Sequence, residues 1–328
     1  MMMDGFDMLL VASAVIAGAT PLVMATLGET LTERAGVVNL SLDGTIVLSA
    51  MAAFVVASLS GSLLAGFAVS AAVGACVAAL VALFSVRLGM SQVAVGFVLT
   101  LMTRDLAYFL GSQYARTEGP ISGSAPVPVL SGMPVLGQVL FNHSVPVYLS
   151  MIMVAFAWWY LYRTSWGLRL RCVGENMEAA YARGIDPDLV RVVYTVAGGA
   201  LVGLSGAAFS LCTKPGWGQP QGCEGSGWIA LALVIFGAWH PVRAALGAYL
   251  FAFLQVMSIH FQSWFPDVPA QVFQVAPFPL MIFLLAVSTL VHSEEAKMLA
   301  ERHPLLRILT RGLAQAPPLS LGKARSRD

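Results

Sequence analysis

The stretch WGLRLRCVGENMEAAYARGID, residues Trp166–Asp186, is the only long charged segment that lies between two strongly apolar runs. The flanking runs, Val147–Tyr162 and Val190–Cys212, are each long enough to enter or cross a bilayer. A charged side chain at the bilayer centre costs roughly 2.5–3.5 kcal/mol on insertion scales, so the stretch between them must lie in water. Residues 163–191 hold five arginines, and the positive-inside rule therefore predicts that this loop is cytoplasmic.

The middle of this loop has the composition of a short helix. Met177–Arg183 (MEAAYAR) contains good helix formers, Asn176 can cap its start, and Gly184 can end it. A short helix held at the membrane surface by two flanking spans suits the docking of a soluble partner. The alternative is an ordinary cytoplasmic loop.

Composition indicates an integral membrane protein. Apolar residues make up 58% of the chain and charged residues 11%, whereas soluble globular proteins have about 25% charged residues. Thirty-one glycines suit close helix–helix packing in lipid, and a net charge of +1 gives no indication of nucleic-acid binding. The predicted fold class is all-α: a polytopic membrane protein.

The apolar runs predict about nine crossings, within a range of 8–10 transmembrane helices, of which one or two are short or broken. The N-terminus is expected outside and the C-terminus in the cytoplasm. Thr45–Leu59 has about 15 residues where a span needs ~20, so it is expected to borrow length from the polar segment before it. Trp228–Trp239 is a half-span that His240-Pro241 ends. The other runs are Met8–Leu27, Leu63–Val86, Val93–Leu110, Val147–Tyr162, Val190–Cys212, Ala244–Phe261 and Val272–Val291.

The chain is expected to divide into a transmembrane domain, residues 1–292, and a basic cytoplasmic tail, residues 293–328. Within the first, the Gly-, Pro- and Ser-rich residues 112–144 predict an external loop, and residues 163–191 form the cytoplasmic one. The tail carries seven basic residues between Lys297 and Arg327. Its composition predicts a surface helix to about Arg311 and disorder after Pro317-Pro318.

The polar stretch Gly28–Gly44 has two interpretations. Either it is a loop in which Glu33 and Arg34 are ordinary charges at the membrane surface, or it unwinds within the membrane and lines a solute pathway. We favour a pathway role for Asn39 and Asp43, because amide and carboxylate groups hydrogen-bond to the hydroxyls of a polar solute.

The next apolar run carries further polar residues. Gln92 opens it and is a candidate for the same pathway. Arg104 and Asp105 lie about 100° apart on a helix, so they need not pair with each other, and charged partners on neighbouring helices are the expected alternative.

A second Gly- and Pro-rich external stretch, Thr213–Gly227, contains Trp217 and Glu224. An aromatic belt at the outer interface explains its tryptophan without any function. The alternative is a gate or rim where a soluble binding protein releases substrate, with Trp217 stacked on rings and Glu224 paired with polar edges.

No pattern of a catalytic or metal site occurs in the sequence. The GxxxxGK[ST] motif of an ATP site is absent, as are HExxH, CxxC and GxSxG, and the five histidines are scattered. We therefore predict no catalytic residue, no metal ligand and no cofactor bound by this chain. Cys212 and Cys223 are expected as free thiols, or as a disulfide if both face outward.

Four stretches carry a family resemblance. Tyr162–Asp186 (YRTSWGLRLRCVGENMEAAYARGID) resembles the coupling-helix loop of permease subunits of ATP-binding-cassette (ABC) importers. The branch it resembles is that of simple-sugar and nucleoside permeases, which work with a lipoprotein-type substrate-binding protein. Ser41 and Asp43 stand where this branch usually has Gly and Glu, and Cys172 where it usually has Ala. The other matching stretches, in the family's order, are GETLTERAGVVNLSLDG (Gly28–Gly44), PVLSGMPVLGQVLF (Pro128–Phe141) and GSGWIALALVIFGAWHP (Gly225–Pro241).

The resemblance implies the transmembrane permease subunit of an ATP-driven importer of nucleosides or simple sugars in the inner membrane. Its implied partners are an ABC ATPase that uses ATP and magnesium, a second permease chain (a sister permease or a second copy), a lipoprotein-type binding protein and membrane lipid, but no nucleic acid. An ion-coupled secondary transporter of a small polar solute is the alternative, and a membrane-embedded enzyme or scaffold is a third possibility. The predicted coupling residues are Gly174, Glu175, Asn176, Ala179, Ala180, Arg183 and Gly184.

Overall fold

The computed structural model describes residues 8–128, 130–133, 135–265, 267–269, 272, 279, 282 and 317–323. All regular elements in this part of the chain are helices, as the all-α prediction requires. They are α1 (Met8–Arg34), α2 (Leu42–Ser60), α3 (Leu63–Ala82), η1 (Leu83–Arg87), α4 (Gln92–Gly111), η2 (Ser112–Tyr114), η3 (Leu130–Gly132), α5 (Leu136–Leu140), α6 (Val145–Arg163), α7 (Ser165–Glu175), α8 (Met177–Ala182), α9 (Pro187–Ala208), η4 (Phe209–Thr213), α10 (Ser226–Phe236) and α11 (Pro241–Trp264).

Seven helices in the described residues are long and apolar enough to cross a membrane, which confirms a polytopic membrane protein. α10 is a shorter apolar helix, as the half-span Trp228–Trp239 predicted. The last predicted crossing, Val272–Val291, falls almost wholly outside the described residues. The spanning helices are α1, α2, α3 with η1, α4 with η2, α6, α9 with η4, and α11.

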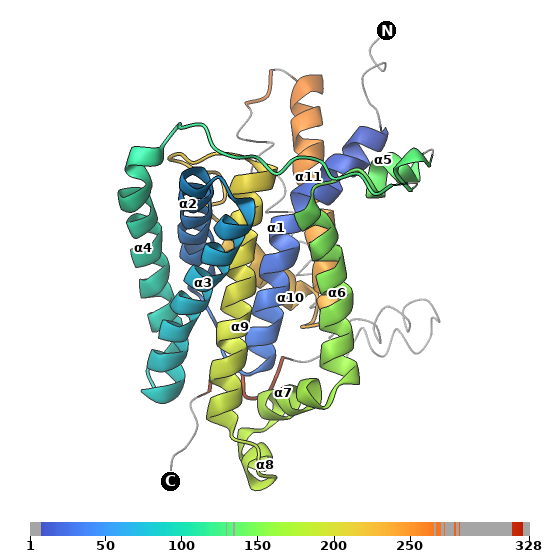
Figure 1. Cartoon of the computed structure of the whole chain (residues 1–328). Coiled ribbons are helices and arrows are strands. Elements are labelled where there is room, and N and C mark those ends of the chain that lie inside the picture. Colours follow the sequence, from blue (N-terminus) through green and yellow to red (C-terminus); the bar gives the residue numbers. More distant parts are fainter. Residues whose placement is uncertain are drawn as a thin grey trace.

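The spanning helices run side by side, with α7 and α8 at one end of the bundle and α5 at the other (Figure 1). Helix α9 packs against α1, α2 and α3. Glycines permit these contacts: a Cβ on Gly28 of α1 would meet the carbonyl oxygen of Gly198 on α9, closer than real Cβ atoms approach. Small residues at helix crossings therefore bring these backbones together, as is usual in membranes.

Helix α1 is longer than predicted. It continues past Leu27 to Arg34, and Glu33 and Arg34 lie buried inside the bundle. The interpretation of these two residues as surface charges in a loop is therefore wrong. The apolar run alone underestimated the length of α1, because a spanning helix tolerates polar side chains when the bundle supplies their hydrogen-bond partners.

A non-helical linker, Ala35–Ser41, joins α1 to α2, and is called the α1–α2 linker below. The Val38 amide donates to Gln92 Oε1 at 2.8 Å, and the Thr100 hydroxyl donates to the Leu40 carbonyl at 2.6 Å. Gln92 and Thr100 lie about 12 Å apart along α4, so the linker runs along α4 over this distance before α2 begins. The stretch has the unwound backbone predicted for a broken helix.

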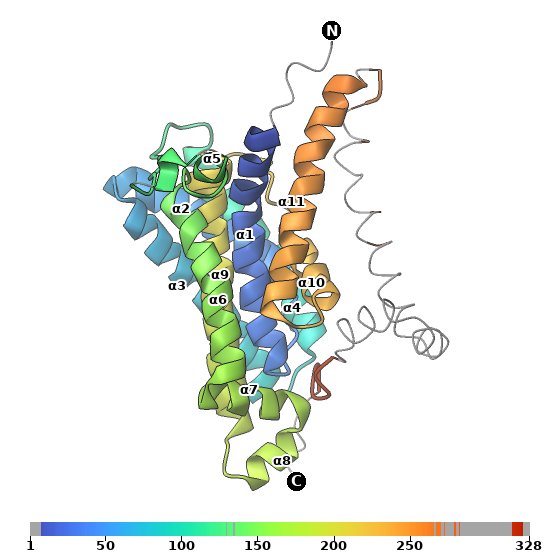
Figure 2. The ribbon, with the colours of Figure 1, turned by 90° about the vertical axis from the view of Figure 1, so that its right-hand side faces the viewer.

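The C-terminal tail departs from its prediction. Pro317–Lys323 was expected to be disordered, yet it lies packed beside α7, with Pro318 and Ser320 buried (Figure 2). Hydrogen bonds to the bundle hold it there, and composition alone cannot show them. The predicted surface helix to Arg311 lies outside the described residues. Cys212 and Cys223 are free thiols.

Candidate functional site

Residues 163–191, called the coupling loop below, form two helices and not one. The expected short helix is present as α8, where Asn176 Oδ1 accepts from the Ala179 amide at 2.9 Å and Gly184 follows the helix at φ 79°. Helix α7 before it was missed. Its signal is Thr164, whose hydroxyl oxygen accepts from the Gly167 amide at 3.0 Å. The charged residues of α7 led to its interpretation as part of a loop, so this cap was not recognised.

The predicted coupling residues divide by exposure. Gly174 and Ala180 are buried toward the bundle. At Gly174 the backbone lies so close to the Arg34 carbonyl that no Cβ fits. Gly174 therefore positions the loop against the end of α1, and Ala180 packs α8 against Val173, Met177 and Val190. The others face solvent and can meet a partner: Glu175, Asn176, Ala179, Arg183 and Gly184.

Three arginines of the coupling loop lie over aromatic rings. Arg163 lies 5.8 Å from the Trp158 ring, Arg169 4.9 Å from Trp166, and Arg171 5.0 Å from Tyr162. Each cation–π contact is worth about 0.5–1 kcal/mol where the pair is exposed. These contacts hold the cationic side chains at the end of the bundle.

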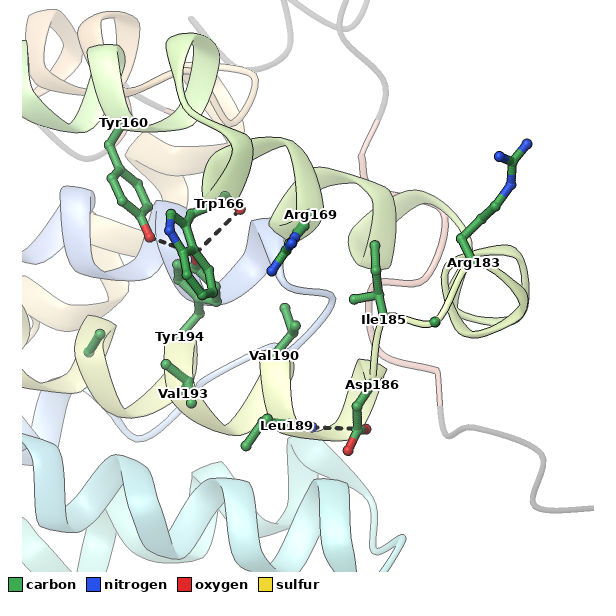
Figure 3. Close-up of a pocket in the computed structure, with 12 residues that line it drawn as sticks. Tyr160, Trp166, Arg169, Arg183, Ile185, Asp186, Leu189, Val190, Val193 and Tyr194 are labelled. Atoms are coloured by element: carbon green, nitrogen blue, oxygen red, sulfur yellow. Dashed lines mark hydrogen bonds between the residues drawn. The ribbon is translucent and has the colours of Figure 1, made fainter.

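A groove of about 580 Å³ lies between α7 and α9, beside α8 (Figure 3). Its floor is aromatic: the Tyr160 and Tyr194 hydroxyls lie 2.7 Å apart, and the Tyr194 hydroxyl donates to the Trp166 carbonyl at 3.4 Å. At its rim, Asp186 Oδ1 accepts from the amides of residues 188 and 189 and so caps α9. Arg169 turns toward the groove, whereas Arg183 points away from it. Sequence reasoning did not anticipate this groove.

Asn39 lies in the α1–α2 linker and is buried. Its amide donates to Glu29 Oε1 at 3.2 Å, while its own Oδ1 accepts from the Ser41 amide at 3.1 Å and the Ser41 hydroxyl at 2.6 Å. Gln92, also buried, accepts from the neighbouring Val38. The structure therefore brings both candidates to the linker, where Asn39 Oδ1 and Gln92 Oε1 accept hydrogen bonds from the chain.

Asp43 lies in the first turn of α2 and accepts from the Gly227 amide at 3.1 Å, at the start of α10. The N-termini of the spanning helix α2 and the short helix α10 thus meet with one carboxylate between them. Helix N-termini carry partial positive charge, so both attract this carboxylate. A helix that begins inside a bundle is typical of solute sites in transporters.

Trp217 is buried and does not belong to an aromatic belt. Its Nε1 donates to the Gly111 carbonyl at 2.9 Å, and its ring centroid lies 5.7 Å from that of Tyr108. Glu224 accepts from the Tyr108 hydroxyl and from the Gln221 amide at 2.7 Å. Burial opposes ionisation of Glu224, but its hydrogen bonds outweigh this effect and lower its pKa. Only two residues separate Glu224 from Gly227, so this stretch leads toward Asp43.

Two acidic residues that were given no role connect these parts. Glu29 is fully buried and holds the amide of Asn39, while Glu33 accepts from the Trp239 indole in the turn after α10. Arg34 donates to the Trp239 carbonyl at 2.9 Å. The last two turns of α1 therefore bind both the α1–α2 linker and the end of α10. The available signal was an acidic pair four residues apart in an apolar helix.

Arg104 and Asp105 form an ion pair, with Nε and Oδ1 3.5 Å apart, although neighbours on a helix were expected to find separate partners. Both side chains are exposed enough to bend toward each other. Within the described residues, no three His, Cys, Asp or Glu side chains are grouped so that they could hold a metal ion.

The sequence profile of the family described as branched-chain amino acid transport system / permease component matches residues 11–285. The chain belongs to this family. It is 35% identical over 255 residues to the putative glucose ABC transporter permease protein TsgC13 of Haloferax volcanii, which covers 76% of this chain and 77% of that protein. The nucleoside ABC transporter permease protein NupC of Lactococcus lactis is 32% identical over 285 residues, 82% of this chain and 89% of its own length. The guanosine ABC transporter permease protein NupQ of Bacillus subtilis is 31% identical over 294 residues, 84% and 91% of the two chains.

No solved structure matches the chain. The family and these relatives confirm the resemblance read from the four stretches: the chain is the membrane permease subunit of an ABC importer. Such permeases associate with an ATPase and a substrate-binding protein.

Proposed function

We propose that this permease translocates nucleosides across the inner membrane and that the coupling loop transmits the movements of a separate ATPase. Simple sugars are the second choice. Among the relatives that cover more than four-fifths of the chain, the two that are more than 30% identical to it are a nucleoside and a guanosine permease, which supports the first choice; a glucose permease covers as much of the chain at 25% identity. A nucleoside offers hydroxyls and polar base edges, which amide and carboxylate side chains recognise.

One observation carries the coupling proposal: the coupling loop touches α1 directly below the α1–α2 linker. Gly174 contacts the backbone of Arg34, the last residue of α1, and the linker begins at the residue after Arg34. A partner bound to exposed Glu175 and Arg183 would therefore act on the segment that carries Asn39. The buried positions transmit the movement and the exposed ones bind the partner.

The proposed solute pathway passes the meeting point of α2 and α10. Here Asp43 and Gly227 are bonded to each other, and Asn39 is bonded to Ser41. A solute hydroxyl inserted between Asp43 and Gly227 can donate to the carboxylate and accept from the amide, so that neither buried group is left unsatisfied, which would cost about 1–3 kcal/mol. Gln92 holds the linker beside the pathway, while Trp217 and Glu224 line its proposed outer part.

The complete importer would contain further chains. A second permease, either a sister chain or a second copy, would form the other half, and a lipoprotein-type binding protein would supply the solute. The ATPase would use ATP and magnesium, and this chain would bind no cofactor. The coupling loop and the C-terminus would lie in the cytoplasm, and the N-terminus and residues 112–144 outside.

A pull-down of the tagged chain in mild detergent tests this proposal. Wild type should recover a P-loop ATPase, and Glu175→Arg should not, because it reverses a charge on the exposed face of the coupling loop. Glu118→Arg, an exposed charge reversal outside the coupling loop, is the control and should recover the ATPase like wild type. Recovery of the chain alone, active in uptake driven by an ion gradient, would make it a secondary transporter.

Isothermal titration of the co-purified binding protein then tests the solute. Binding of ribose in place of a nucleoside would favour the second choice, a permease for simple sugars. Binding of neither, with a branched-chain amino acid bound instead, would refute both.

A further inference from the structure

The segment Pro317–Lys323, called the C-terminal brace below, lies beside α7 at the α7–α8 end of the bundle (Figure 2). The Ser320 amide donates to the Gly174 carbonyl of α7 at 2.8 Å. Pro318 and Ser320 are buried, whereas Leu319 between them is 64% exposed. The segment forms turns, in which the Leu321 amide donates to the Pro318 carbonyl at 2.9 Å and the Lys323 amide to the Ser320 carbonyl at 3.1 Å, and one face of these turns lies on the protein.

The brace also contacts the α1–α2 linker. A Cβ on Gly36, which has φ +85°, would lie 3.3 Å from the Ser320 carbonyl oxygen and 3.4 Å from its Cβ. Gly322 approaches Val38 in the same way, with 4.0 Å from its ideal Cβ to Val38 Cγ2. The brace therefore touches the coupling loop on one side and the linker on the other.

Arg191 of α9 bonds to both the brace and the linker and is only 1% exposed. Its Nη2 donates to the Lys323 carbonyl of the brace at 3.0 Å and to the Gly36 carbonyl of the linker at 3.3 Å. Its Nη1 lies 3.5 Å from Met177 Sδ of α8. A buried guanidinium needs acceptors, and the brace supplies one of its two carbonyls. Without the brace, this cation would be left short of partners at the junction of α8, α9 and the linker.

We infer that the C-terminal brace joins the coupling loop to the α1–α2 linker, so that the two move together during transport. This inference rests on the proposed function of the coupling loop and adds a third element to it. The reason is geometric: the brace bonds to α7 through Ser320 and shares Arg191 with the linker, and it fills the space between them. A rigid connection passes a displacement of the coupling loop to the residues that carry Asn39, whereas a loose one dissipates it.

Cross-linking tests whether the contact exists and whether it persists during transport. In a full-length chain with its four cysteines replaced by alanine, Gly36→Cys and Ser320→Cys place two Cβ atoms about 3.4 Å apart, close to the ~3.5–4.5 Å of a disulfide. Gly36→Cys with Leu319→Cys is the matched control, because Leu319 points to solvent. Mass spectrometry of the oxidised, assembled importer should find the 36–320 link and little of the 36–319 link. The linked importer should transport like its reduced form.

Removal of the brace tests its role. A chain that ends at residue 316, and the variant Ser320→Pro, which lacks the amide donor, should still recover the ATPase. Solute moved per ATP hydrolysed should fall about fivefold in Ser320→Pro, as one lost hydrogen bond of ordinary strength predicts, and further in the truncated chain, which also loses the bond from Arg191. Leu319→Ala should leave this ratio unchanged.

Several outcomes would contradict the inferred role of the C-terminal brace. Equal linking of both cysteine pairs would show that the contact is absent, and a link that stops transport would show that the segment must be released. An unchanged ratio in the truncated chain would remove its role, and loss of ATPase recovery would make it part of the docking surface instead. If wild type itself recovered no ATPase, the proposed function would fail, while the linking result would still report on the contact.

Discussion

Gly174→Ala should weaken the contact between the coupling loop and α1. A Cβ at residue 174 would lie 2.1 Å from the Arg34 carbonyl oxygen, and real Cβ atoms essentially never approach within 3.0 Å. The helix end must therefore move by about 0.9 Å, away from a backbone atom that cannot rotate aside. Overpacking of this kind typically costs about 1–3 kcal/mol. Glu175 follows Gly174 directly, but it and the exposed residues of α8 keep their side chains, so ATPase binding should survive while transport falls.

The assay compares thermal unfolding in detergent with ATP-driven uptake in proteoliposomes. Gly18→Ala is the matched control, because nothing lies within 4 Å of an added Cβ there and alanine is the better helix former. Gly174→Ala should unfold at a lower temperature and take up less solute per ATP, and Gly18→Ala should do neither. Wild-type stability together with wild-type uptake in Gly174→Ala would refute the close contact on which the coupling argument depends.

Three further substitutions test separate parts of the site. Arg191→Met should expose the C-terminal brace to limited proteolysis, because hydrogen bonds from a charged group contribute about 1.5–3 kcal/mol; digestion like wild type would contradict this. Glu224→Gln should lower the melting temperature most at neutral pH. The folded pKa of Glu224 is lowered, so its stabilisation is present above the ordinary pKa of 4.5 and is lost as pH falls through the folded value. A difference between variant and wild type that grew in acid would have the wrong sign. Asp43→Ala should reduce transport more than Asp43→Asn, which keeps an acceptor for Gly227, and neither should reduce ATPase recovery; loss of recovery would make Asp43 structural.

Local patterns predicted most of the fold. Apolar runs located the spanning helices, and the cap residues Asn176 and Gly184 located α8. The end of α1 was missed, because Glu29 and Glu33 look like loop residues until Asn39 and Trp239 are known to bond with them. Such partners are far apart in the sequence, and no local propensity contains them.

The candidate site was predictable in its location but not in its bonding. The stretch Gly28–Gly44 was identified, and within it Asn39 and Asp43, but their partners come from residues up to 184 positions away. Trp217 shows the same limit. A tryptophan in a Gly- and Pro-rich loop reads as an interface residue, yet the carbonyl of Gly111 and the ring of Tyr108 draw it into the core. The packing of Pro317–Lys323 depends on Arg191 in the same way, and composition could only predict disorder.

The last two turns of α1 connect every part of the proposed mechanism. Arg34 lies against Gly174 of the coupling loop, Glu33 and Arg34 hold the turn after α10 at Trp239, and Glu29 holds Asn39. Helix α10 in turn presents its N-terminus to α2. A displacement of α7 thus reaches α2 and α10 through one segment, and the two helices meet at the proposed solute site. Because the contacts are hydrogen bonds of buried side chains and one close glycine approach, a shift of an ångström at the loop is large enough to separate the N-termini of α2 and α10.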